Sequence, residues 1–222
     1  MIMGWKIVDT GGTAMRKIGI LWLVGVLALV LAGCGGEDWH STVVIRSLSD
    51  QPVDGDVGFT ASSTYLISQA DVARNVQYGI DSLGTEFRAF LDFPLDGSTG
   101  GGVVPLSAVI VSADIEVYVN NVTLSSSVPT LLDLVPFPLT GLTSADFNSV
   151  PLLTRTPFNI RSSDINNFVR IDVTSLMVEA QRRGLPSLQL RFLLDLVLGA
   201  SGLVQLDDGV LGRAPLLTVE FR

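Results

Sequence analysis

From Thr42 to the end of the chain, apolar and polar residues alternate in short runs. The clearest run spans residues 109–119. Alternation with a period of two places successive side chains on opposite faces of a β-strand, so that one face meets a core and the other meets water. In this run the expected inward residues are Val111, Ala113, Ile115, Val117 and Val119, and the expected outward ones are Ser112, Asp114, Glu116 and Tyr118.

The same pattern predicts further strands, with their polar side chains in water. Phe90 interrupts the polar face of its run, and we expect it to pack under a loop. Residues 130–139 are apolar, but Pro136 and Pro138 restrict them to an edge or bulged strand. The other alternating runs are 85–95, with polar Glu86, Arg88 and Asp92; 168–173, with polar Arg170 and Asp172; 188–196, with polar Gln189, Arg191 and Asp195; and 217–222.

One short helix is expected near residues 175–183. Thr174 or Ser175 can cap its start, and Gly184 and Pro186 end it. Roughly ten strands, separated by Gly, Pro and Asp turns, surround this helix in the sequence. The fold class that follows is all-β: an antiparallel β-sandwich, jelly-roll-like, with one short helix.

The start of the chain has a different pattern. Met15-Arg16-Lys17 precedes an apolar run from Ile18 to Ala32, and at 15 residues this run is too short to span a bilayer. A positive start, a short apolar stretch and small residues after it are typical of a cleaved export signal. We therefore expect a signal peptide over residues 1–33 with Met15 as the true start, a tether over 34–41, and a sandwich domain over 42–222.

Leu31-Ala32-Gly33-Cys34 resembles the lipobox of bacterial lipoproteins. The resemblance implies that Cys34 is lipidated, becomes the mature N-terminus and anchors the protein to a membrane. Gly35 replaces the Asp that retains such proteins in the inner membrane, so the resemblance implies an outer-membrane location, on the periplasmic or surface face. The alternative, that Cys34 is an incidental small residue, would leave an unpaired thiol open to oxidation.

Composition excludes several classes of function. Cleavage before Cys34 removes one of 22 acidic and three of 14 basic residues, which leaves 189 residues with a net charge of −10. An acidic surface repels nucleic acid, so no nucleic-acid partner is expected. The single His and single Cys lie in or before the tether, which argues against triad catalysis and zinc sites.

Carboxylates remain as candidate ligands. Asp54-Gly55-Asp56 and Asp207-Asp208-Gly209 are turn-like acidic clusters, and carboxylates on flexible backbone suit calcium. We expect these aspartates to be the candidate ligands of a structural calcium ion; no other cofactor is expected. The alternative is that Asp and Gly simply make good turns.

The order of several strand sequences is similar to the DNRLRE-type domain, a carbohydrate-binding-module-like β-sandwich of exported bacterial proteins. The matching segments run from about residue 54 to residue 222: Phe87–Phe93, Val109–Val117, Ile171–Thr174 and Arg213–Val219. The resemblance implies a sandwich fold and a glycan ligand. The domain lacks the Trp-rich middle of many such proteins, so Tyr118, on the predicted polar face, is the candidate ligand platform.

Three functions follow as hypotheses. The first is a non-enzymatic, lipid-anchored envelope module that binds a protein partner or has a structural role. The second is a carbohydrate-binding surface lipoprotein, which exposed Tyr65, Tyr78 and Tyr118 on one face would favour. The third is a carboxylate-based glycoside hydrolase, which would need two carboxylates at the separation that this chemistry requires.

Overall fold

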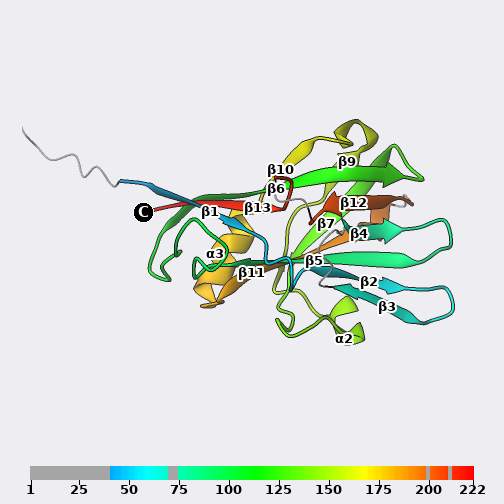
Figure 1. Cartoon of the computed structure of the whole chain (residues 1–222), viewed down its shortest axis with the longest axis horizontal. Helices are drawn as coiled ribbons and strands as arrows, with labels where there is room; N and C mark the ends of the chain where they lie inside the picture. The colour runs from blue at the N-terminus through cyan, green and yellow to red at the C-terminus, as the bar shows by residue number, and fades with distance from the viewer. Residues whose placement is uncertain (1–40, 70–74, 199–200, 210–211) are drawn as a thin grey trace, which may run out of the picture. The chain divides into compact units, whose positions relative to one another are not determined.

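The computed structural model describes residues 41–69, 75–198, 201–209 and 212–222. Within these ranges, Thr42–Arg222 forms one compact unit, an antiparallel β-sandwich (Figure 1). The described strands are β1 Val43–Leu48, β2 Gly55–Phe59, β3 Tyr65–Gln69, β4 Asn75–Ile80, β5 Glu86–Pro94, β6 Ile110–Thr123, β7 Ser127–Leu134, β8 Leu153–Thr154, β9 Phe158–Arg161, β10 Phe168–Asp172, β11 Ser187–Leu194, β12 Leu203–Asp207 and β13 Leu216–Phe221.

The predicted helix is confirmed as α3, Thr174–Arg182. Leu176, Met177 and Ala180 form its buried face. The carboxylate of Glu179 forms ion pairs with Arg182 and Arg183 at the end of the helix. Shorter helical turns were not predicted from the pattern: α2 Ser144–Phe147, η1 Ser162–Asp164 and η2 Leu196–Leu198.

Strand β6, with 14 residues, belongs to both layers of the sandwich. Its first half pairs with β13 on one side and β10 on the other, and β1 completes this layer beyond β13. Its second half pairs with β12, which continues through β4 to β5. The second layer contains β3, β2, β5, β11 and β7, with the short β8 and β9 beside β7. Every strand pairing in the described ranges is antiparallel.

The main core lies between these layers, and α3 closes one end of it. Ile45, Ile115 and Val219 come from the first layer, and Leu91 and Leu190 from the second; all are buried in one apolar cluster. Because the two inner faces share one cluster, the predicted sandwich architecture is confirmed. The inward positions predicted for β6 are also confirmed, except Val111, which is 45% exposed. A register shift in β13 between Glu220 and Phe221 leaves Val111 outside.

A second, smaller core covers the other face of β5 and β11. Phe90 packs there against Val57, Phe137 and Phe147, in agreement with its predicted place under a loop. The segment between β7 and β8, which carries α2, supplies Phe137, Leu142 and Phe147.

This cover overturns the prediction that the polar positions of β5 and β11 face water. Asp92, Gln189 and Arg191 are buried, and so is Asp195 just after β11. Gln189 satisfies both main-chain polar groups of Phe137, whose N–H donates to Oε1 and whose oxygen accepts from Nε2. The side-chain amide of Gln189 therefore makes the two hydrogen bonds that a neighbouring strand would otherwise make with Phe137.

The prediction for residues 130–139 was also wrong. Strand β7 is not an edge, because β11 pairs with it on one side and β8 and β9 on the other. Pro136 and Pro138 follow the end of the strand at Leu134, so their missing N–H groups interrupt no ladder.

Candidate functional site

A surface pocket of about 300 Å³, here called the acidic pocket, has Asp50 and Asp208 in its wall. The segment after β1, the loop after β5 and the turn after β12 form its wall, to which Ser49, Asp50, Thr99 and Asp208 contribute. The hydroxyl of Ser49 donates to Oδ1 of Asp208 at 3.5 Å. Of the four predicted calcium ligands, Asp208 lines this pocket, and Asp54 lies close to Asp208.

Asp54 lies behind the wall and is 1% exposed. Its Oδ1 accepts the backbone N–H of Asp92 at 2.6 Å. Burial, and then repulsion by the neighbouring carboxylate of Asp208, raise the pKa of Asp54 well above its ordinary value. Its Oδ2 receives no hydrogen bond from the described residues. A proton on Asp54 removes the cost of burying two negative charges side by side.

Asp92 adds a second buried carboxyl group on β5. It is 1% exposed, and burial is the largest cause that raises its pKa to about 6. The negative charges of Asp50 and Asp96 act in the same direction. The sequence pattern predicted that this side chain faces water, so Asp92 was not identified as a buried carboxyl group. No signal in the alternation distinguishes a solvated aspartate from one covered by a distant segment.

The other two predicted calcium ligands make different contacts. Oδ2 of Asp56 accepts the backbone N–H of Gln77 at 3.3 Å. Asp207 accepts from Nδ2 of Asn120 at 3.0 Å and from the N–H of Gly209 at 3.2 Å. Across the described ranges, no three His, Cys, Asp or Glu side chains form a group that could hold a metal ion. The four aspartates therefore do not form such a group.

The Asp54–Asp208 pair also differs from a glycosidase pair. Retaining and inverting enzymes place their carboxyl groups about 5–5.5 Å and 6.5–9.5 Å apart, with substrate or water between them. Here the two carboxyl groups lie close enough for the charge of Asp208 to raise the pKa of Asp54, and both side chains are buried, at 1% and 3% exposed. The two buried carboxyl groups are therefore not open to a sugar.

The tyrosines do not form an open aromatic surface. Tyr118 is only 7% exposed: its ring meets Phe168 at a centroid distance of 5.1 Å, and the guanidinium of Arg213 lies 4.3 Å from the ring centroid. Tyr78 is fully buried and shares a hydrogen bond with Thr130, while Tyr65 is half-buried beside Phe59. The predicted exposure of Tyr118 is wrong, because β10 and the segment before β13 cover its ring.

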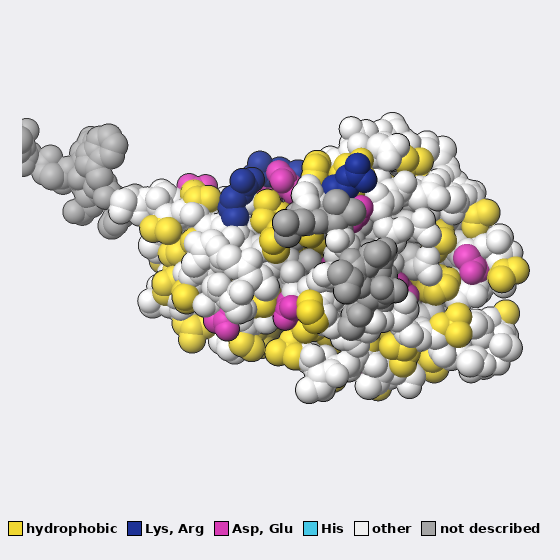
Figure 2. Space-filling model, viewed as in Figure 1, with side chains coloured by type: hydrophobic (Ala, Val, Ile, Leu, Met, Phe, Trp, Pro, Cys, Tyr) yellow, Lys and Arg dark blue, Asp and Glu magenta, His cyan; other side chains and the backbone are white. Residues whose placement is uncertain are grey.

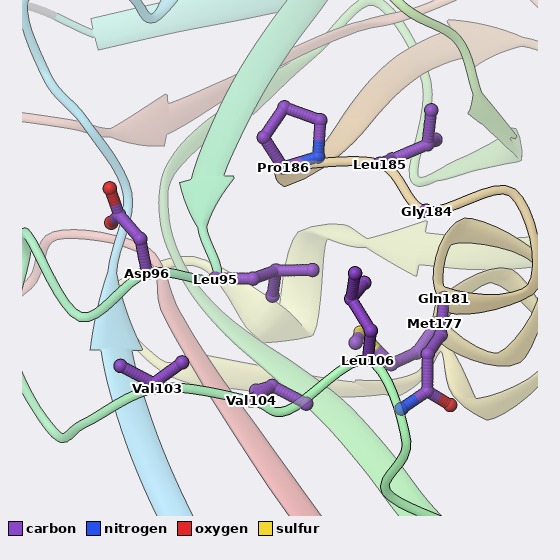
Figure 3. A pocket seen from close by; sticks show the side chains of 10 residues that line it. All are labelled: Leu95, Asp96, Val103, Val104, Leu106, Met177, Gln181, Gly184, Leu185 and Pro186. Carbon is purple, nitrogen blue, oxygen red and sulfur yellow. The ribbon is translucent and has the colours of Figure 1, made fainter.

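A second pocket, of about 280 Å³, is apolar (Figure 3). It lies between the last turn of α3 and the segment that leads from β5 to β6. The aliphatic side chains of Leu95, Val104, Leu106, Met177 and Leu185 line it, and Asp96 and Gln181 are its polar members. The amide of Gln181 donates to the carbonyl of Pro105 at 2.9 Å, which connects the helix to this segment.

Cys34, with the predicted signal peptide and nearly all of the predicted tether, lies outside the described residues. Within the ranges that are described, no helix has the length and apolar character needed to span a bilayer. No protein-family model matches the chain, and no curated protein matches it either.

Proposed function

We propose that this chain is a lipid-anchored β-sandwich of the bacterial cell envelope, which acts as a non-enzymatic interaction or structural module. The observation that carries the proposal is Leu31-Ala32-Gly33-Cys34, directly after a short apolar run with a positively charged start. Its membrane is the outer membrane, because Gly35 stands where a retention signal would require Asp.

The domain that follows is suited to an anchor at its N-terminus. Strand β1 begins at Val43 and pairs with β13 along its whole length, from Val43 with Phe221 to Leu48 with Leu216. Six residue pairs with the final strand hold the entry point in the sheet. A force applied through the tether therefore acts on a strand that is hydrogen-bonded into the sheet.

The test is the intact mass of the protein in membrane fractions, compared between wild type and Cys34→Ala. We expect a lipid-sized mass on the wild type, absent from the variant, and release of the variant into the soluble fraction. Globomycin, which blocks the lipoprotein signal peptidase, should leave the wild-type leader uncut. A lipase should remove acyl chains and so reduce the added mass.

Cys34→Ser is the matched control, since it keeps a small polar side chain but cannot form the thioether. It should behave as Cys34→Ala does. An unmodified wild-type chain in the soluble fraction would overturn the proposal, and Cys34 would then be a free thiol.

A further inference from the structure

One end of the sandwich carries exposed aliphatic side chains on adjacent elements. They belong to the start of β1, the start of β6 and the segment before β6, and each is between 45% and 67% exposed. Single exposed aliphatic residues are ordinary on a protein surface, but a group that shares one end of a domain marks a contact surface. This apolar rim consists of Val43, Val44, Val103, Leu106, Val109 and Val111.

Main-chain pairing brings the members of the apolar rim together. Val43 pairs with Phe221 of β13, and Phe221 pairs in turn with Ile110, the neighbour of Val109 and Val111. The N–H of Val109 donates to the carbonyl of Arg222 at 2.8 Å. In Figure 1 the start of β1 and the C-terminus lie at the same end, and Figure 2 shows hydrophobic side chains there.

The apolar rim continues into the apolar pocket. Val103 and Leu106 belong to both, and behind them the pocket is lined by Leu95, Met177 and Leu185 (Figure 3). Arg46 and Arg222 are exposed beside the rim, and Arg46 shares the outward face of β1 with Val44. Aliphatic side chains flanked by arginines suit the boundary between lipid headgroups and acyl chains, where a guanidinium can reach the phosphates.

The short length of chain before the domain indicates which partner the apolar rim contacts. Only residues 35–41 separate Cys34 from Thr42. A fully extended chain gains at most about 3.6 Å per residue, so the start of β1 stays within roughly 30 Å of an anchor at Cys34. The end that carries the apolar rim is therefore kept close to the membrane surface at all times.

We propose that the apolar rim docks onto the lipid bilayer that holds the anchor. The inference rests on the proposed function, because it takes the lipid on Cys34 as given. Docking fixes the direction of the sandwich: the turn between β2 and β3, at the opposite end in Figure 1, points away from the membrane.

The test of docking introduces a single labelling site into a protein whose only cysteine is Cys34. Since Cys34 is the only cysteine and is blocked when lipidated, Leu106→Cys gives the full-length protein one reactive thiol. The lipidated protein, carrying an environment-sensitive fluorophore at 106, is placed on vesicles of phosphatidylethanolamine and phosphatidylglycerol with nitroxide-labelled acyl chains. Ser62→Cys, in the exposed β2–β3 turn, is the matched control.

We expect quenching of the label at 106 to be several-fold greater than at 62. Val109→Asp in the Leu106→Cys protein should reduce that quenching, whereas Val150→Asp, an equal change at a site that is 84% exposed and outside the rim, should not. Equal, weak quenching at 106 and 62, with the protein still on the vesicles, would overturn docking and leave the anchor standing. A label at 106 that becomes shielded only as protein concentration rises would also overturn docking, in favour of a second copy.

Failure of the anchor would look different. The protein would carry no lipid mass and would not sediment with vesicles, and both proposals would fall together. Intact mass, measured on the same sample, separates this outcome from failure of docking alone.

Discussion

At the scale of single residues, the buried pair of Arg191 and Asp133 is the main polar contact of the second layer. Their side chains are 4% and 5% exposed, and Nη2 of Arg191 donates to Oδ2 of Asp133 at 2.6 Å. Nη1 of Arg191 also donates to the carbonyls of Asp146, Phe147 and Ser149. One guanidinium thus neutralises a buried carboxylate and holds the segment that covers the second core.

We predict that Arg191→Leu lowers the free energy of unfolding by about 3–5 kcal/mol, because it leaves Asp133 charged and buried without its partner. The matched control is Arg170→Leu. Arg170 pairs with Asp114 at the same 2.6 Å, but its side chain is 63% exposed. Surface pairs contribute at most about 1 kcal/mol, so the control should change stability little. Urea unfolding of both variants measures the difference, and equal losses would show that burial does not govern these pairs.

At the scale of elements, the loop after β5 protects an open sheet edge. Strand β1 is the last strand of its layer, and its outer edge would otherwise present unpaired main-chain groups. Gly101 packs directly against the backbone of Arg46, so closely that a Cβ at this position would overlap the Arg46 carbonyl oxygen. The glycine-rich sequence 100–102 thus packs against β1 in the structure.

We predict that Gly101→Ala destabilises the protein more than Gly184→Ala does. Both glycines have left-handed backbone, with φ of +63° and +66°, so both variants bear a conformational cost of about 1–2 kcal/mol. A Cβ atom at position 101 would overlap the backbone of Arg46, whereas a Cβ atom at position 184 would have nothing within 4 Å. Overlap with a fixed backbone should add about 1–3 kcal/mol. Thermal unfolding measures both, and equal shifts would mean that the loop does not bear on β1.

The alternation of residues was sufficient to predict most strands and the sandwich, because period two reports directly which side chains share a face. The alternation could not indicate which segment covers the outer face of β5 and β11. Arg191 and Asp92 looked solvated, since the segment that buries the outer face of their layer comes from elsewhere in the chain. Phe90, an apolar residue on a polar face, was the one local signal of this cover.

The candidate site shows the same limit. The sequence predicted Asp54 and Asp208 as ligands from distant segments, and the structure brings these two side chains close together. It could not show that Asp56 and Asp207 accept hydrogen bonds from other partners. Contacts of that kind depend on the register between strands, which composition and spacing leave open.

At the scale of the whole molecule, the buried carboxyl groups make stability depend on pH. The pKa of Asp54 is raised well above its ordinary value and that of Asp92 is raised to about 6, so the folded protein binds these protons more tightly than the unfolded chain. The free energy of unfolding should therefore fall as pH rises from about 4, where an unfolded aspartate titrates, through about 6 and above. For Asp92, a shift of about two units corresponds to at most roughly 3 kcal/mol.

The groups whose pKa is lowered, such as Asp172 and Glu179, do not oppose this trend. Their stabilising effect is present above the ordinary carboxyl pKa and is lost only as pH falls below about 4, outside the window. We therefore expect urea unfolding between about pH 4 and pH 7 to show stability decreasing as pH rises. Most acidic proteins lose some stability over this range by general charge repulsion as well, so the wild-type slope alone does not identify the groups.

Neutral variants separate the two causes. Asp54→Asn and Asp92→Asn keep the size of the side chain and remove the ionisable group, so each should flatten the slope and raise stability near pH 7 relative to wild type. Glu116→Gln removes the same charge from a partly exposed position on β6 and should leave the slope nearly unchanged. If all three variants flatten the slope equally, net charge governs the pH dependence. If only the two buried positions do, the protons held beside the acidic pocket stabilise the folded sandwich.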